Sequence, residues 1–218
     1  MFEIYDKRSW SGLGIIYRTI GNYIALKLSH TSIMANSVTL IGLLFGILAG
    51  ILLSLGNYRF GIVALIFLQL AMVLDYTDGT LARLKNEVTP FGQSLDSISG
   101  HTIFVVINIA IAIMFRFDTI IMFGVLVIVS SRHLTYVIDR YFHKTTSILK
   151  SGQNNYKIIL DLFFPTHIVS YYLLFSFSYL LEIVRIFIVY SAVLFVIRLL
   201  HRTNKARNKG LILENIPT

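Results

Sequence analysis

The chain has 218 residues, of which 56% are hydrophobic, and its mean hydropathy of +0.73 is higher than soluble domains usually reach. Its net charge of +8 would suggest nucleic acid as a partner of a soluble protein. In a membrane protein the same charge indicates basic cytoplasmic loops and anionic lipid, so we expect membrane lipid and no nucleic acid as a partner. No cysteine is present, which excludes zinc sites built from thiolates.

Residues 7–30 are predicted to form an N-terminal amphipathic interfacial helix. Their apolar side chains recur every three to four positions, while Arg18 and Lys27 interrupt the apolar sequence. This pattern is typical of a helix that lies in the plane of the membrane interface. A helix buried in the core of the protein is the alternative.

Six apolar segments follow, and they predict an all-α integral membrane protein, a six-transmembrane-helix bundle. The first segment carries Gly42, Gly46 and Gly50, a spacing that allows a neighbouring helix to approach closely. We expect one membrane domain over 1–218, with an interfacial helix at 7–30, a core at 31–200 and a tail at 201–218. The expected spans are 38–56, a second from about Phe60 past Asp75, 97–115, 119–139, 162–181 and 183–200.

The basic residues predict the orientation of these spans. Six spans place both termini on one side of the membrane. The N-terminal segment, the connection between spans two and three, the connection between spans four and five, and the tail lie on that side. They hold 4, 2, 5 and 5 Lys and Arg residues, 16 of the 19 in the chain. Only Arg59, Arg116 and Arg185 fall on the other side. Since basic residues are retained in cytoplasmic loops, we expect both termini in the cytoplasm of a multi-pass protein, in the plasma membrane if the source is prokaryotic.

Three carboxylates stand out in the connection between the second and third spans. Asp75 and Asp78 are three positions apart and therefore share a helix face. Pro90 then interrupts the helix, and the side chain of Asp96 follows on the next one. Carboxylates at membrane depth are costly and usually serve a function, so we expect the active site here, at the cytoplasmic face.

Oxygen ligands alone favour Mg²⁺ or Mn²⁺, which bind phosphate oxygens of a substrate at the same time. Arg83 is close enough in angle to Asp75 to reach a phosphate or a nucleotide. Gly79 and Ala82 leave room for a flat group against the helix. A bundle in which Asp75 and Asp78 form salt bridges with Arg83 and Lys85 is the structural alternative.

These residues resemble the signature of the CDP-alcohol phosphotransferase (CDP-alcohol phosphatidyltransferase) family, DGxxAR followed by GxxxDxxxD. The matching positions are Asp75, Asp78, Gly79, Ala82 and Arg83, followed by Gly92 and Asp96. Upstream, Ala35, Asn36 and Thr39 occupy the positions of the usual Pro-Asn-x-x-Thr.

The resemblance implies a transferase of phospholipid biosynthesis that moves a phosphatidyl or other phosphoalcohol group from a CDP-alcohol, such as CDP-diacylglycerol, to an alcohol or phospho-alcohol acceptor. CMP is released, and a homodimer is the usual assembly. By the same resemblance, Asp75, Asp78 and Asp96 hold two metal ions. The residues implied for the nucleotide are Asn36, Gly79, Ala82, Arg83 and Thr89.

Position 100 departs from the signature. The family has its fourth aspartate there, the proposed general base, and this chain has Gly100. His101 is a candidate replacement, but its side chain is turned about 140° from Asp96 on a regular helix. A histidine packed at a helix end is the other interpretation. The chain is therefore either a transferase or a degenerate member that binds CDP-lipid or a partner.

Basic residues between the fourth and fifth spans are the candidates for binding a phosphorylated acceptor, with contacts to lipid headgroups as the alternative. They are Arg132, Arg140 and Lys144.

Overall fold

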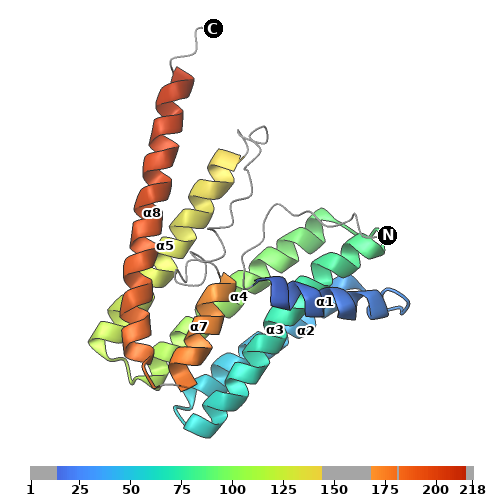
Figure 1. Cartoon of the computed structure of the whole chain (residues 1–218), viewed down its shortest axis with the longest axis horizontal. Helices are drawn as coiled ribbons and strands as arrows, with labels where there is room; N and C mark the ends of the chain where they lie inside the picture. The colour runs from blue at the N-terminus through green and yellow to red at the C-terminus, as the bar shows by residue number, and fades with distance from the viewer. Residues whose placement is uncertain (1–13, 144–167, 181, 215–218) are drawn as a thin grey trace.

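The computed structural model describes residues 14–143, 168–180 and 182–214, and within these ranges the chain is helical without a strand (Figure 1). The helices are α1 (Gly14–Leu28), α2 (Ala35–Ser54), α3 (Tyr58–Leu84), α4 (Pro90–Met114), α5 (Thr119–His143), α7 (Ile168–Leu180) and α8 (Val184–Glu214).

In the described ranges, five helices are long and apolar enough to cross a membrane: α2, α3, α4, α5 and the first 21 residues of α8. The prediction of an all-α integral membrane bundle is confirmed. The expected fifth span, 162–181, is described only over the 13 residues of α7, and its first part lies outside the described residues. The count of six spans therefore stays a prediction.

Close packing of α2 against its neighbours depends on glycine. A Cβ atom at Gly46 would lie 2.4 Å from Cγ1 of Ile103, and one at Gly50 would lie 2.3 Å from Cγ1 of Val106. Gly42 faces Leu74 of α3 in the same way, at 3.3 Å. The glycine ridge predicted from the sequence therefore serves packing within the chain, where it brings α3 and α4 against α2.

Helix α1 crosses the end of α3 that leads to the acidic residues (Figure 1). Its buried face consists of Tyr17, Gly21 and Ala25, while Ile16 and Ile20 on other faces are exposed. The hydroxyl of Tyr17 donates to the side-chain oxygen of Gln69 in α3. One face of α1 thus packs on α3, and apolar side chains on its other faces are exposed. Residues 7–13 of the predicted helix lie outside the described residues, and its place at the membrane interface stays a prediction.

The second half of the chain pairs α5 with α8, which lie side by side (Figure 1). Aromatic side chains fill the space between α4, α7 and α8: Phe104 contacts Tyr171, Tyr172 and Phe195, with ring centroids 5.4 to 6.4 Å apart. The hydroxyl of Tyr171 donates to Asn108 Oδ1 at 2.8 Å, which satisfies a polar pair inside the bundle.

Two helices extend beyond the apolar spans expected. Helix α4 begins at Pro90, ahead of the span expected from residue 97, and it carries Asp96 as predicted. Pro90 stands in its first turn, and Thr89 caps it by accepting from the Gly92 N–H at 3.0 Å. Helix α8 continues to Glu214, beyond the span expected to end at residue 200. No proline occurs between residue 200 and Glu214, so the helix can extend beyond its apolar part.

Candidate active site

The acidic segment becomes a site because two helix ends meet there. Helix α3 ends at Leu84, a short connection follows, and α4 starts at Pro90, so the last turns of α3 face the first turns of α4. The start of α2 completes the arrangement, since a Cβ atom at Gly92 would lie 3.0 Å from Asn36 Oδ1. Glycine at position 92 therefore allows α4 to approach the side chain of Asn36.

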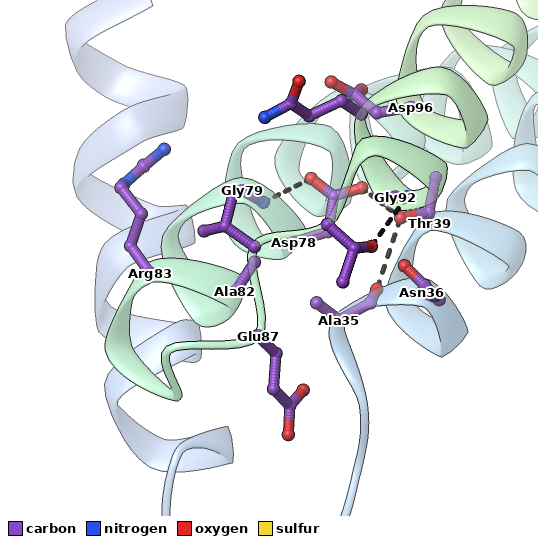
Figure 2. Close-up of a pocket in the computed structure, with 13 residues that line it drawn as sticks. Ala35, Asn36, Thr39, Asp78, Gly79, Ala82, Arg83, Glu87, Gly92 and Asp96 are labelled. Carbon is purple, nitrogen blue, oxygen red and sulfur yellow. Dashed lines mark hydrogen bonds between the residues drawn. The ribbon is translucent and has the colours of Figure 1, made fainter.

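One cavity, with a volume of about 230 Å³, lies between these three helix ends (Figure 2). All five residues predicted to contact a nucleotide line it, together with two of the three carboxylates, Asp78 and Asp96. The lining residues are Ala35, Asn36, Thr39, Asp78, Gly79, Ala82, Arg83, Glu87, Val88, Thr89, Gly92, Gln93 and Asp96.

Asp78 is buried and held by two donors (Figure 2). The hydroxyl of Thr39 donates to its Oδ2 at 2.5 Å, and the backbone N–H of Gly79 donates to its Oδ1. Arg83 is close enough for electrostatic attraction. Both oxygens of Asp78 keep further lone pairs, so the two donors orient the carboxylate without excluding a cation.

Asp75 lies one helical turn from Asp78, and it does not line the cavity. Its carboxyl group is instead within hydrogen-bonding range of the carboxyl group of Asp96 on α4. Two carboxylates at such a distance repel each other unless a proton or a cation lies between them. The structure thus brings Asp75 and Asp96 together, and Asp78 is close enough to both for electrostatic repulsion.

The donor set fits a hard divalent cation, because carboxylate and hydroxyl oxygens are the groups that meet here. However, within the described ranges no three His, Cys, Asp or Glu side chains already converge as a preformed metal site. Asp78 points to Thr39, while Asp75 points to Asp96. Rotation of these carboxylates is needed before all three contact one ion.

The alternative in which Asp75 and Asp78 form salt bridges with Arg83 and Lys85 is wrong, because both basic side chains have other partners. The Lys85 ammonium donates to the backbone carbonyls of Thr31 and Ile33, both at 2.7 Å, and so fixes the connection between α1 and α2. The Arg83 guanidinium donates to the hydroxyl of Thr80 at 3.1 Å. In the described part of the chain neither base forms an ion pair with Asp75 or Asp78.

Position 100 opens onto free space, since a Cβ atom there would meet no atom within 4 Å. His101 points elsewhere: its Nδ1 lies 2.8 Å from the Ser97 carbonyl, and its ring meets the ring of Tyr136 on α5, with centroids 4.5 Å apart. A carbonyl only accepts, so Nδ1 donates. His101 does not line the cavity.

Of the three basic residues predicted for the acceptor, Arg132 is placed inside the bundle. Its guanidinium lies over the ring of Phe104, 4.4 Å from the centroid, and it is close enough to Asp75 for electrostatic attraction. Arg140 lies near the end of α5, where only the backbone is described, and Lys144 lies outside the described residues.

Six lining residues were not assigned a role from the sequence, and three of them, Ala35, Thr39 and Gly92, belong to the matched sequence patterns. Thr39 belongs to the Asn-x-x-Thr pattern at the start of α2, which was a usable signal for a polar contact with the acids. Glu87, Val88 and Gln93 have no such signal. Glu87 and Val88 reach the cavity because the α3–α4 connection borders it, and Gln93 reaches it from the first turn of α4. Both are tertiary features that spacing does not predict.

Comparisons with known proteins identify the family of the chain and a solved structure with a similar fold. The sequence model of the CDP-alcohol phosphatidyltransferase family matches residues 32–200. Among solved structures, the fold is similar to phosphatidylinositol phosphate synthase of Mycobacterium tuberculosis, crystallised with CDP-DAG bound, with a TM-score of 0.59 and 19% identity over 86% of this chain and 94% of that chain. A search of curated protein sequences found no match.

The family match covers most of the chain, including every residue that lines the cavity. The solved structure, at 19% identity, supports the fold. The chain belongs to the CDP-alcohol phosphatidyltransferase family.

Proposed function

We propose that this protein is a membrane transferase that moves a phosphatidyl or other substituted phosphate group from a CDP-alcohol to an acceptor hydroxyl and releases CMP. The observation that carries the proposal is the single cavity that collects Asn36, Gly79, Ala82, Arg83 and Thr89 beside two carboxylates. Residues from three helices, far apart in sequence, line this one cavity, as a binding site requires.

The donor is held by the cavity, with its cytidine against Gly79 and Ala82, where the absence of large side chains leaves room for a flat ring. Arg83 supplies a positive charge for the diphosphate. Asn36 and Thr89 provide polar groups on the opposite wall. CDP-diacylglycerol is the expected donor, and the CDP-DAG bound to the similar mycobacterial enzyme supports this choice.

Asp75, Asp78 and Asp96 are the residues that would hold Mg²⁺ or Mn²⁺. The close approach of Asp75 to Asp96 supports this role, because a cation between them removes their repulsion. A bound divalent ion neutralises charge on the diphosphate leaving group. Thr39 donates to Oδ2 of Asp78 and so limits the orientations that this carboxylate can take when an ion binds.

In the reaction the acceptor oxygen forms a bond to the phosphorus of the substituted phosphate, and the bond from that phosphorus to CMP breaks. The acceptor hydroxyl loses its proton, and Gly100 provides no group to take it. A positioned base typically contributes about 10²–10⁴ in rate, so we expect this chain to be a slow transferase. A non-catalytic member that binds CDP-lipid is the second candidate, favoured by the same glycine.

The acceptor is proposed to bind near Arg132, with Arg140 and Lys144 as further contacts. Arg132 is the best supported of the three, because it lies beside Asp75 in the bundle interior, and its Nε has no hydrogen-bond partner among the described residues. A partly buried guanidinium with a buried, unused Nε donor suits a phosphate or a polyol hydroxyl. The homodimer and the cytoplasmic position of the site remain part of the proposal.

The test is release of CMP from radiolabelled CDP-diacylglycerol by the purified protein, with a panel of alcohols and phospho-alcohols. Release that depends on Mg²⁺ and on one acceptor supports the transferase. If wild type releases none and Gly100→Asp does, the non-catalytic interpretation is correct. If both bind CDP-diacylglycerol but neither releases CMP with any acceptor, the transferase proposal fails.

A further inference from the structure

The guanidinium of Arg83 is anchored at the cavity wall by another side chain of α3. Its Nη2 donates to the hydroxyl of Thr80 at 3.1 Å. Its Nη1 lies 3.6 Å from the position that a Cβ atom at Gly79 would take, so the guanidinium lies beside the glycine that lines the cavity (Figure 2). Arg83 is otherwise exposed, and without this anchor its side chain would extend into water.

The hydroxyl of Thr80 is in turn oriented by α1. Thr80 Oγ1 lies 2.8 Å from Oδ1 of Asn22 and 3.1 Å from the backbone carbonyl of Tyr76. Both of these oxygens can only accept, so the single hydroxyl proton of Thr80 is directed to this side and is shared between the two acceptors. The lone pairs of Thr80 are therefore directed away from α1, to the Nη2 donor of Arg83.

Asn22 is held at this place by the packing of α1 on α3. A Cβ atom at the neighbouring Gly21 would lie 3.0 Å from Cβ of Tyr76 and 3.1 Å from the backbone nitrogen of Thr77. The rings of Tyr17 and Tyr76 stack with centroids 6.4 Å apart, one turn away. These contacts, at the residue before Asn22 and about one turn earlier, fix the position of Asn22 relative to α3.

We propose that Asn22 and Thr80 are positioning residues for Arg83, which hold its guanidinium over the cavity where the diphosphate of a CDP-alcohol binds. The inference rests on the proposed function. It gives α1 a second role beside lying at the membrane: this helix sets the position of a charge in the donor site. Loss of either positioning residue weakens donor binding and leaves the carboxylates in place.

The experiment uses the full-length protein in nanodiscs, with affinity for CDP measured by calorimetry and KM and kcat measured from CMP release. The variants are Thr80→Val and Asn22→Ala, with Thr80→Ser as the conservative variant. Thr203→Val is the matched control, because the hydroxyl of Thr203 donates to the Leu200 carbonyl of its own helix, α8, and Thr203 does not line the cavity. Arg83→Ala, alone and combined with Thr80→Val, completes a double-mutant cycle.

Thr80→Val and Asn22→Ala are expected to weaken CDP binding and raise KM by about 3- to 10-fold, the range for one lost hydrogen bond, with kcat nearly unchanged. Serine at position 80 restores binding, and Thr203→Val behaves as wild type. In the Arg83→Ala background, Thr80→Val adds no further loss, because the group that it positions is gone. A merely structural role would add its loss in that background as well.

The inference is overturned if Thr80→Val binds CDP like wild type, if it lowers kcat at constant KM, or if its loss is additive with that of Arg83→Ala. If Thr80→Val unfolds the protein, Asn22→Ala and the serine variant decide by the same criteria. Wild type that binds no cytidine nucleotide would overturn the proposed function, and this inference with it. Binding by wild type with unaltered variants overturns this inference alone.

Discussion

Thr39 is the residue that best shows how a side chain next to the acids contributes to the site. It is buried at the start of α2, and its hydroxyl contacts Oδ2 of Asp78 at 2.5 Å and the Ala35 carbonyl at 3.2 Å. A partner of this kind fixes the direction of the carboxylate lone pairs. Thr39 therefore links the polar pattern of α2 to the acidic end of α3.

We predict that Thr39→Val lowers the affinity for Mg²⁺ by about 10- to 100-fold, the usual cost of losing a hydrogen bond to a metal ligand. Valine has a similar shape, so the cavity stays intact while the donor to Asp78 is lost. The measurement is the Mg²⁺ concentration that gives half-maximal CDP binding. Thr39→Ser keeps the hydroxyl and should remain close to wild type, and equal Mg²⁺ dependence of all three proteins would contradict the role.

Gly100→Asp is predicted to fold like wild type and to raise the rate of CMP release by about 10²–10⁴, the contribution of a positioned base. A new side chain there meets no atom within 4 Å of its Cβ, and it stands one turn after Asp96. The rate is measured at saturating Mg²⁺, with Gly100→Asn as the control that has the same shape without a base. An aspartate variant no faster than the asparagine variant would show that the base lies elsewhere.

At the scale of elements, the acidic end of α3 and the glycine ridge of α2 could be predicted from the sequence. Both depend on spacing along one helix, and a helix converts spacing into direction without further information. The start of α4 could not be located by hydropathy, since its first turns, with Gln93 and Ser94, are polar and only the Thr89 cap with Pro90 marks the boundary.

The glycine ridge gives a test of packing between elements. Gly46→Ala places a methyl group about where it would overlap Ile103, whose Cγ1, Cδ1 and Cγ2 atoms lie 2.4 to 2.9 Å from the new Cβ. We expect a loss of about 1–3 kcal/mol in the free energy of unfolding, as is usual for overpacking. The loss is measured by denaturant unfolding in detergent micelles.

Gly100→Ala is the matched control for that substitution, because its new methyl group meets open space. Removing a glycine from a helix stabilises it by roughly 0.5–1 kcal/mol, so this variant should be as stable as wild type or more stable. Equal effects of the two alanine substitutions would mean that α2 and α4 are not packed as described.

At the scale of the whole molecule, the sequence predicted the helical membrane architecture, but not how the two halves of the chain meet at the site. The proximity of Arg132 on α5 to Asp75 on α3 is a tertiary contact between residues 57 positions apart, and no periodicity encodes it. The contact of His101 with Tyr136 is of the same kind, since it depends on how α4 and α5 pack.

The orientation in the membrane is also a property of the whole chain. Because the sequence has no cysteine, single cysteines can report it directly. We predict that the cysteine introduced by His30→Cys or by Thr203→Cys reacts with an impermeant maleimide only from the cytoplasmic side. Cysteines at Leu55 and Glu182, in connections at the other ends of the helices, should react only from the opposite side. Labelling of all four from one side would contradict the alternation of spans.

The measurement that tests the central claim most directly is calorimetric titration of CDP into the purified protein, with Mg²⁺ and then with EDTA. The account predicts binding in Mg²⁺, loss of binding in EDTA, and loss in Mg²⁺ for Asp78→Asn, because the carboxylates act on the diphosphate through a divalent ion. This holds whether or not Gly100 permits turnover. The account would be contradicted if wild type in EDTA and the Asp78→Asn variant in Mg²⁺ both bound CDP as tightly as wild type does in Mg²⁺.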